Sequence, residues 1–209
     1  MLGIFGGSFD PVHLGHIKSA IALLNCYEFE EIRFIPCQQS PLKKKAFVDV
    51  QYRWEMLNLI TESNDKLTVD DLEIKRPGPS YTIDTVQEIY EKNQKKNVLV
   101  LIVGLDAYLE FCAWHKYSEI LSYCHVMLLQ RPGYALPKYG CEKDLYDEYV
   151  TLDIEKLLRT KNGYIFLSDI EKIDISSTTI RQIIAAEEEP KFLLPGSIWS
   201  YIKRNKLYQ

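Results

Sequence analysis

Two histidines near the amino terminus have the spacing and the neighbours of a phosphate-binding site. His13 and His16 follow paired glycines in the segment Gly-Gly-Ser-Phe-Asp-Pro-Val-His-Leu-Gly-His, which starts at Gly6. Residues three apart on a helix share one face, and the first turn of a helix presents unpaired N–H groups and a positive dipole end. We therefore expect both imidazoles to meet phosphate, with Gly15 leaving room for a phosphate chain beside the backbone. A structural pair or a metal site would use the same spacing.

A second candidate anion site lies near the other end of the sequence, where small hydroxyl residues precede an apolar helical pattern. Ser176 or Ser177 is suited to cap that helix, and Thr178 follows them. Arg181 lies one turn further on, so that a guanidinium and a helix amino terminus come together as a cradle for a leaving pyrophosphate. A capped surface helix with a solvated arginine is the alternative interpretation.

The predicted elements that position these motifs alternate along the chain between short apolar runs, which indicate strands, and helical patterns. Strands are predicted over residues 2–5, 31–36, 67–69, 98–103, 125–129 and 164–167. Helices are predicted over residues 13–24, 48–61, 83–90, 116–123, 177–188 and 197–205. This order predicts an α/β fold, a Rossmann-like doubly wound parallel sheet with helices on both faces, right-handed crossovers and a crevice at the carboxyl ends of the strands. Residues 138–161 are charged and tyrosine-rich; we expect them to be helical in part and assign them no chemistry.

Composition disfavours several classes of protein. The 209 residues suit one compact domain, 1–209, in which residues 175–209 form a carboxyl-terminal helical part. A net charge of -4 disfavours general nucleic-acid binding, and no apolar run approaches the ~18 residues of a membrane span. Five widely spaced cysteines form no CxxC pair, which favours a reducing cytoplasm. The glycines near the amino terminus lack the GxGxxG spacing of a dinucleotide-binding site, and the segment lacks the lysine of a P-loop. The oligomeric state is left open, with a homo-oligomer possible.

At two distant places the motifs resemble those of a known group. His13-Leu14-Gly15-His16 resembles the (H/T)xGH motif of the nucleotidyltransferase superfamily, and the Ile-Ser-Ser-Thr-Thr-Ile-Arg segment ending at Arg181 resembles its ISSTxIR motif. Further segments are similar to those of bacterial nicotinate-nucleotide adenylyltransferases, and they comprise residues 76–85, Gly104-Leu105-Asp106, Trp114-His115 and Arg131-Pro132-Gly133. The resemblance covers nearly the whole chain and implies the nucleotidyltransferase type of the Rossmann-like fold.

This resemblance implies three sets of site residues. The catalytic set, acting on phosphates, is His13, His16, Lys43 and Arg181. The ATP-binding set is Gly6, Gly7, Ser8, Phe9, Gly104, Asp106, Ser176, Ser177 and Thr178, with Asp106 at the ribose. The mononucleotide-binding set is Arg76, Tyr81, Thr82, Trp114, His115 and Arg131. One departure stands out: Leu42 occupies the place of a histidine in the family's Pro-Pro-His-Lys loop, so that the loop relies on lysine charge.

The expected reaction joins the adenylyl group of ATP to nicotinate mononucleotide and gives deamido-NAD and pyrophosphate in NAD biosynthesis. Mg²⁺ is expected to enter with the ATP triphosphate, without an all-protein metal site. Trp114 offers a flat face for a pyridine ring, and Tyr81 and Thr82 offer hydrogen bonds to its carboxylate or carboxamide. Other readings remain open: preference for nicotinamide mononucleotide, dual specificity, a non-catalytic nucleotide-binding regulator, or a metal-dependent hydrolase.

Overall fold

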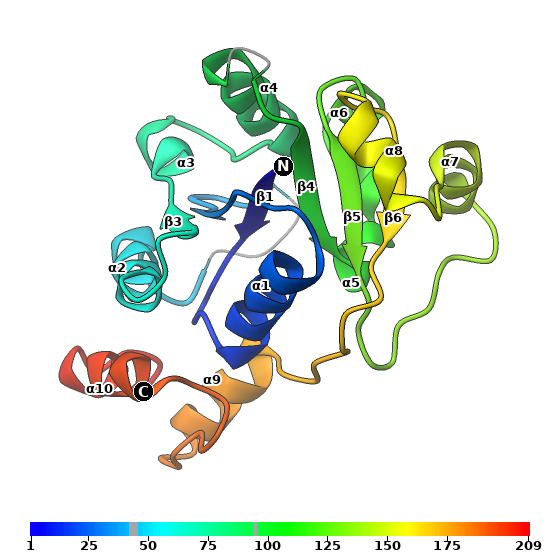
Figure 1. The fold of residues 1–209 in the computed structure, drawn as a ribbon. Helices are drawn as coiled ribbons and strands as arrows, with labels where there is room; N and C mark the ends of the chain where they lie inside the picture. Colours follow the sequence, from blue (N-terminus) through cyan, green and yellow to red (C-terminus); the bar gives the residue numbers. More distant parts are fainter. Residues whose placement is uncertain (42–45, 94–95) are drawn as a thin grey trace.

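The computed structural model describes residues 1–41, 46–93 and 96–209, and within them six parallel strands form one sheet (Figure 1). The strands are β1 (Leu2–Gly7), β2 (Glu31–Pro36), β3 (Leu67–Val69), β4 (Leu99–Gly104), β5 (His125–Leu129) and β6 (Ile165–Leu167). Their order across the sheet is β3-β2-β1-β4-β5-β6, and every neighbouring pair is parallel. The prediction of a doubly wound α/β sheet is confirmed.

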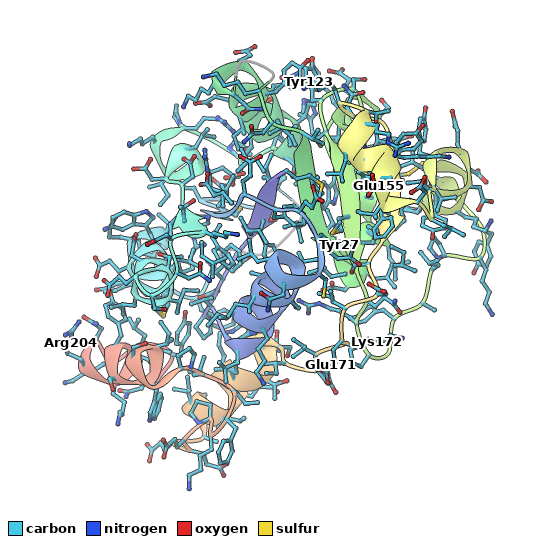
Figure 2. All side chains as sticks on the ribbon, in the orientation of Figure 1. Tyr27, Tyr123, Glu155, Glu171, Lys172 and Arg204 are labelled. Carbon is cyan, nitrogen blue, oxygen red and sulfur yellow. A yellow bond between two sulfur atoms is a disulfide. The ribbon has the colours of Figure 1, made fainter. Side chains whose placement is uncertain are left out.

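The central strands are apolar on both faces, as a parallel sheet covered by helices on each side requires. Along β4, Leu101 packs into the hydrophobic cluster on one face and Ile102 into the cluster on the other, because successive side chains of a strand point in opposite directions. β5 repeats the alternation with Leu128 and Met127. Two cores therefore sandwich the sheet, and Figure 2 shows side chains filling the space between strands and helices.

Helices cover both faces. Those whose buried side chains join one cluster are α1 (Leu14–Cys26), α2 (Val50–Thr61), α8 (Ile154–Arg159), α9 (Ser177–Ala185) and α10 (Gly196–Arg204). The opposite cluster receives α3 (Leu72–Lys75), α4 (Thr82–Lys92), α5 (Leu105–Tyr108), the 3-10 helix η1 (Phe111–Ala113) and α6 (Tyr117–Ile120). In Figure 1, α9 lies beneath α1 and α10 lies beneath α2. No helix in the described part of the chain has the length and apolar character needed to span a membrane.

Strand order reverses at β1, and this reversal places the motifs. The chain moves from β1 outward to β2 and β3, then returns past β1 to continue with β4, β5 and β6. In open parallel sheets a crevice forms outside the carboxyl ends of the strands at such a switch point. β1 ends at Gly7 and β4 ends at Gly104, so both glycines that close these strands face the predicted crevice.

Residues 138–161 contain α7 (Cys141–Tyr149) and α8, which confirms the expectation that this segment is helical in part. One feature of the same region differs from the sequence-based picture. Cys112 of η1 and Cys141 of α7 form a disulfide across a separation of 29 residues, a pairing that the spacing of the cysteines did not suggest. The disulfide, together with a hydrogen bond from the Cys112 backbone N–H to Glu142 at 3.2 Å, joins α7 to the segment that leads into Trp114.

Leu128 and Leu152 make a matched pair for testing the core. Leu128→Ala should lower the free energy of unfolding by about 2–5 kcal/mol, because its fully buried side chain leaves a cavity between β5 and the helices. Leu152 is 91% exposed, so that Leu152→Ala should change the unfolding free energy by less than about 0.5 kcal/mol. Urea titration followed by circular dichroism measures both variants. Equal effects would contradict the placement of β5 in the core.

Candidate functional site

The two motif histidines form a stacked pair at the start of α1. His13 is the residue immediately before the helix, with an extended backbone, and its backbone N–H donates to Nδ1 of His16 at 3.3 Å. The two rings are nearly parallel, with centroids 3.7 Å apart. Phe9 packs edge-on against His16, with ring centroids 5.0 Å apart, which restricts the ring further. The pair is therefore oriented before any ligand arrives.

His13 is a neutral imidazole. Its side chain is buried, and burial together with the nearby positive charge of Arg131 lowers the pKa of His13 to about 3. Nδ1 of His13 is buried without a hydrogen-bond partner among the described residues. A buried polar atom that lacks a partner costs free energy unless a ligand or a water satisfies it. His13 thus offers hydrogen bonding at this site without adding a positive charge.

Gly15 packs closely against the ring of His13. A Cβ at this position would lie 2.9 Å from Nδ1 of His13 and 3.3 Å from Cβ of Ile175. The space beside Gly15 is therefore filled by the His13 ring and by the segment that precedes α9. Glycine is needed here so that His13 can fold back over α1. Gly15 also lines the small cleft beside the two histidines, and a phosphate chain beside its backbone stays a prediction.

The second motif packs directly against the first. Ser176 caps α9 by accepting from the Thr179 N–H at 3.1 Å, and Ser177 donates to the Pro11 carbonyl at 2.9 Å. Arg181 donates to the Asp10 carbonyl at 2.6 Å. Two segments that lie far apart in the sequence therefore meet at the start of α1, as the two anion sites of a single ligand would need.

Arg181 is held by three contacts. Besides the Asp10 carbonyl, its guanidinium donates to Oγ1 of Thr178 at 3.1 Å and stacks on the Phe47 ring, 4.2 Å from the ring centre. The structure therefore places Arg181 and Thr178 beside the amino-terminal motif. Phe47 was not predicted as a neighbour, because no local pattern links it to α9.

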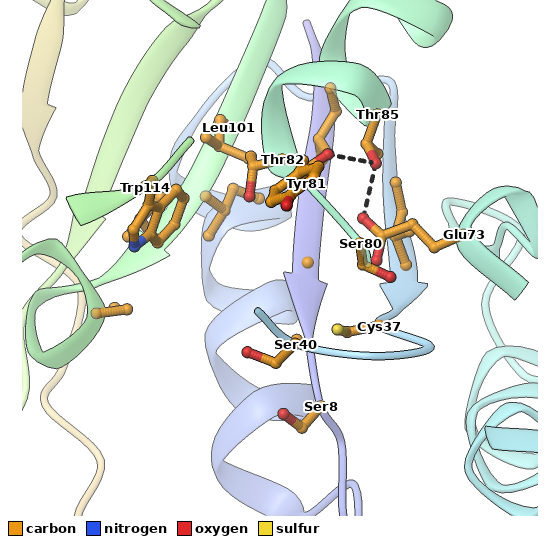
Figure 3. Close-up of a pocket in the computed structure, with 18 of the residues that line it drawn as sticks. Ser8, Cys37, Ser40, Glu73, Ser80, Tyr81, Thr82, Thr85, Leu101 and Trp114 are labelled. Atoms are coloured by element: carbon orange, nitrogen blue, oxygen red, sulfur yellow. Dashed lines mark hydrogen bonds between the residues drawn. The ribbon is translucent and has the colours of Figure 1, made fainter. Parts of the chain in front are cut away.

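A cavity of about 370 Å³ opens beside the paired glycines (Figure 3). Trp114 stands on one wall, and Tyr81 and Thr82 stand at the start of α4 on another. The same cavity is lined by eight further candidates or neighbours of candidates: Gly6, Gly7, Ser8, Ser80, Gly104, Asp106, His115 and Tyr134. Its size and its mixed aromatic and polar lining suit a small flat ligand with a polar substituent.

A small cleft lies next to this cavity, on the side of the histidines. His13, Gly15, His16 and Arg131 line it. Nε of Arg131 pairs with the Asp106 carboxylate at 3.3 Å, and Asp106 also lines the large cavity. The Arg131–Asp106 pair therefore stands at the junction of the two spaces. The sequence resemblance assigned Arg131 to mononucleotide binding. In the structure, Arg131 lines the small cleft beside His13 and His16.

These observations allow a comparison with known proteins. Residues 4–183 match the model of the family described as "Cytidylyltransferase-like". The chain belongs to this cytidylyltransferase-like family. A relative from Methylococcus capsulatus named "Probable nicotinate-nucleotide adenylyltransferase" is 36% identical over 209 residues, which are 100% of this chain and 99% of that protein. A relative of the same name from Aeromonas salmonicida is also 36% identical, over 100% of this chain and 97% of its own.

Solved structures share the fold of this family member. Nicotinic acid mononucleotide adenylyltransferase of Plasmodium falciparum, solved in complex with NaAD, superimposes with a TM-score of 0.73 at 21% identity, covering 99% of this chain and 96% of its own. The Vibrio parahaemolyticus "Putative Nicotinate-nucleotide Adenylyltransferase" has a TM-score of 0.65 at 16% identity, over 99% and 94% of the two chains. Because the sequence identities are only 21% and 16%, these two structures are evidence for the fold of this chain alone.

Two predicted site residues of this cytidylyltransferase-like chain lie away from the expected ligand contacts. Phe9 is buried in the core, with φ of 47°, and serves His16 by packing rather than through exposure to ATP. Arg76 does not line the cavity, since its guanidinium bonds Thr85 Oγ1 at 3.1 Å and Glu88 at 2.8 Å and so anchors α4. Lys43 and Leu42 lie outside the described residues.

Two residues that were not predicted as site residues from the sequence line the large cavity, Ser80 and Glu73. Ser80 accepts hydrogen bonds from the Gln38 and Gln39 N–H groups at 3.1 and 3.4 Å, which ties the loop after β2 to the start of α4. Glu73 accepts from Thr85 at 2.7 Å (Figure 3), and burial raises the pKa of its carboxyl group. Burial of a carboxyl group within the four-residue helix α3 has no sequence signature.

No group of three or more histidine, cysteine, aspartate or glutamate side chains gathers within metal-binding distance in the described ranges 1–41, 46–93 and 96–209.

His13 should remain neutral across the physiological pH range. Its folded pKa of about 3 lies below the ordinary 6.5, so the unfolded state binds the extra proton and stability falls as pH decreases from about 6.5 toward 3. Nuclear magnetic resonance of imidazole nitrogens, assigned with His13→Asn, should show no titration of His13 between pH 8 and pH 5. Arg131→Gln should raise the pKa of His13, since Arg131 is the second cause of its decrease. A wild-type midpoint near 6.5 would contradict the buried placement.

Proposed function

We propose that this chain transfers the adenylyl group of ATP to nicotinate mononucleotide and releases pyrophosphate, a step in NAD biosynthesis. The observation that carries the proposal is the junction of two spaces: the His13–His16 pair with its cleft, and the adjoining cavity walled by Trp114 and Thr82. We assign phosphate to the histidine pair, for its hydrogen-bonding groups, and a pyridine ring to the cavity, for its aromatic wall. The names of the full-length relatives support the same reaction.

The chemistry requires positioning more than proton transfer. The phosphate of the mononucleotide has a second pKa of about 6 and is therefore mostly a dianion at neutral pH. One of its oxygens attacks the α-phosphorus of ATP; the new P–O bond forms as the bond to the β-phosphate bridge breaks, and pyrophosphate leaves with those electrons. No general base is needed. The barrier comes from bringing two polyanions together and from the charge of the transition state.

In this proposal the ends of two helices bind the phosphates. His13 and His16 donate hydrogen bonds to phosphate at the positive end of α1, and the neutral His13 adds no charge that would slow release of the product. Arg181 supplies positive charge for the leaving pyrophosphate, and Lys43 has the same role. Mg²⁺ enters on the ATP triphosphate as part of the substrate and neutralises charge there. Gly104 and Asp106 lie at the ribose.

The acceptor is chosen in the large cavity. Trp114 lies across from Thr82, the first residue of α4 (Figure 3). The positive end of this eleven-residue helix and its free N–H groups favour a carboxylate over a neutral carboxamide. A pyridine ring stacked on Trp114 with its substituent toward Thr82 would therefore bind better as nicotinate. Tyr81 and His115, whose rings are 4.4 Å apart, border the same space.

His16→Ala tests the role of the histidine pair. Loss of one donor to transition-state charge costs about 10²–10³ in kcat, and the fold should persist because His16 is only partly buried on α1. Pyrophosphate release in the presence of MgATP and nicotinate mononucleotide measures the rate, and circular dichroism checks the fold. His115→Ala, at the exposed edge of the other cavity, serves as the comparison and should affect KM for the mononucleotide more than kcat. Ordinary turnover by His16→Ala would remove the pair from the mechanism.

Acceptor preference tests the assignment of the large cavity. The value of kcat/KM should be at least about tenfold higher for nicotinate mononucleotide than for nicotinamide mononucleotide, because the end of α4 stabilises a negative substituent. Parallel assays of the two acceptors at fixed MgATP give the ratio. Equal values would indicate dual specificity. A lack of product with both would favour a nucleotide-binding regulator, and zinc-dependent hydrolysis of ATP would favour a metal hydrolase.

A further inference from the structure

Asp10, in the turn between β1 and α1, is a buried junction of several segments. Its carboxylate accepts from the Phe47 N–H at 2.7 Å and from the Tyr208 hydroxyl at 2.8 Å. Its carbonyl accepts from Arg181 at 2.6 Å. Only 4% of Asp10 is exposed, so solvent cannot replace these partners. The position of this one residue therefore affects the guanidinium of Arg181 and the backbone of Phe47 together.

The buried guanidinium of Arg53 binds the same turn. Arg53 of α2 is 1% exposed and donates to the Ser8 carbonyl at 2.6 Å. Its Nε has no hydrogen-bond partner among the described residues. Asp10 favours the charged form of this guanidinium, although burial is the larger influence and lowers the pKa of Arg53. The turn of residues 8–11 is thus fixed by the charge of Arg53 and by the hydrogen bonds of Asp10.

Tyr208 reaches Asp10 from a strained backbone. Its φ is 65°, and that of Lys206 is 52°, a conformation that costs of order 1 kcal/mol for a residue with a side chain. Leu207 between them is buried in the core, and its N–H donates to the Ile202 carbonyl of α10 at 3.1 Å. This segment is therefore bound firmly to α10, and the strained backbone directs the phenol back to the turn of the first motif.

We propose that Tyr208 is a positioning residue for adenylyl transfer: its hydroxyl holds Asp10 so that the β1–α1 turn and Arg181 are aligned for the phosphates. The inference rests on the proposed function. Tyr208 contacts neither cavity and acts through Asp10. The acceptor pocket around Trp114 and Thr82 lies on other elements, so that loss of the hydroxyl affects turnover and leaves acceptor binding intact.

Tyr201 provides a matched control on the same carboxyl-terminal part of the chain. Its hydroxyl donates to the Glu55 carboxylate at 2.6 Å, a tyrosine–carboxylate bond like that of Tyr208, but one that joins α10 to α2 away from the motifs. Tyr208→Phe and Tyr201→Phe each remove one hydroxyl and keep the ring that packs against the core. The two variants separate a general loss of stability from a loss of alignment.

The test compares kcat, KM and melting temperature for the two variants, for Asp10→Asn and for Asp10→Asn/Tyr208→Phe. We expect Tyr208→Phe to lower kcat by about 10- to 100-fold, with KM for nicotinate mononucleotide unchanged within about twofold, since small misplacement is costly in the transition state. Tyr201→Phe should keep wild-type kcat at a similar melting temperature. The double variant should have the kcat of Asp10→Asn alone, because Tyr208 acts through that carboxylate.

Either of two results would overturn the inference: equal kcat in Tyr208→Phe and Tyr201→Phe, or independent, multiplying effects of the Asp10 and Tyr208 changes. Absence of adenylyl transfer by the wild-type chain would instead overturn the proposed function. In that event, the rise in melting temperature caused by MgATP reports on the alignment. A smaller rise in Tyr208→Phe than in Tyr201→Phe supports the positioning role, and equal rises reject it.

Discussion

Parallel pairing of β1 with both β2 and β4 is the constraint on which the rest of this structure depends. Since β1 lies between these strands, its backbone hydrogen-bonding groups are satisfied along both edges, and the chain after Gly7 has to leave the sheet at its carboxyl end. The neighbouring strand β4 ends at the same edge with Gly104. The turn into α1 and the turn into α5 are thereby brought together, which creates the junction of the cleft and the large cavity.

Around that junction, burial controls the electrostatics. His13 is kept neutral by burial and by Arg131, while Arg131 is itself paired with Asp106. Arg181 is held by a carbonyl, a hydroxyl and the face of Phe47, none of which carries a negative charge. The site therefore separates a neutral donor from a positive charge. This division suits a reaction in which a phosphate attacks phosphorus and pyrophosphate leaves.

Local pattern predicted much of the fold, because the strands most fully buried have the simplest signature. The unbroken apolar run at residues 98–103 became β4, shifted by a single residue, and residues 125–129 became β5 as predicted. The histidine pair and the motif ending at Arg181 were identified from short segments. Contacts across the fold were beyond such reasoning: the Arg76 ion pair with Glu88, the His13 ring over Gly15, and the Asp10–Tyr208 bond across 198 positions. Each depends on tertiary packing, which leaves no periodic pattern in the sequence.

The central claim is that the acceptor's own phosphate attacks the α-phosphorus of ATP at the His13–His16 site. Oxygen-18 in the nonbridging phosphate positions of nicotinate mononucleotide follows this step directly, with mass spectrometry of the dinucleotide and of the released pyrophosphate after incubation with unlabelled MgATP. The account predicts that all of the label remains in the dinucleotide, including its new bridge, and that the pyrophosphate carries none. Label in pyrophosphate, or conversion of ATP to AMP without a dinucleotide, would contradict it.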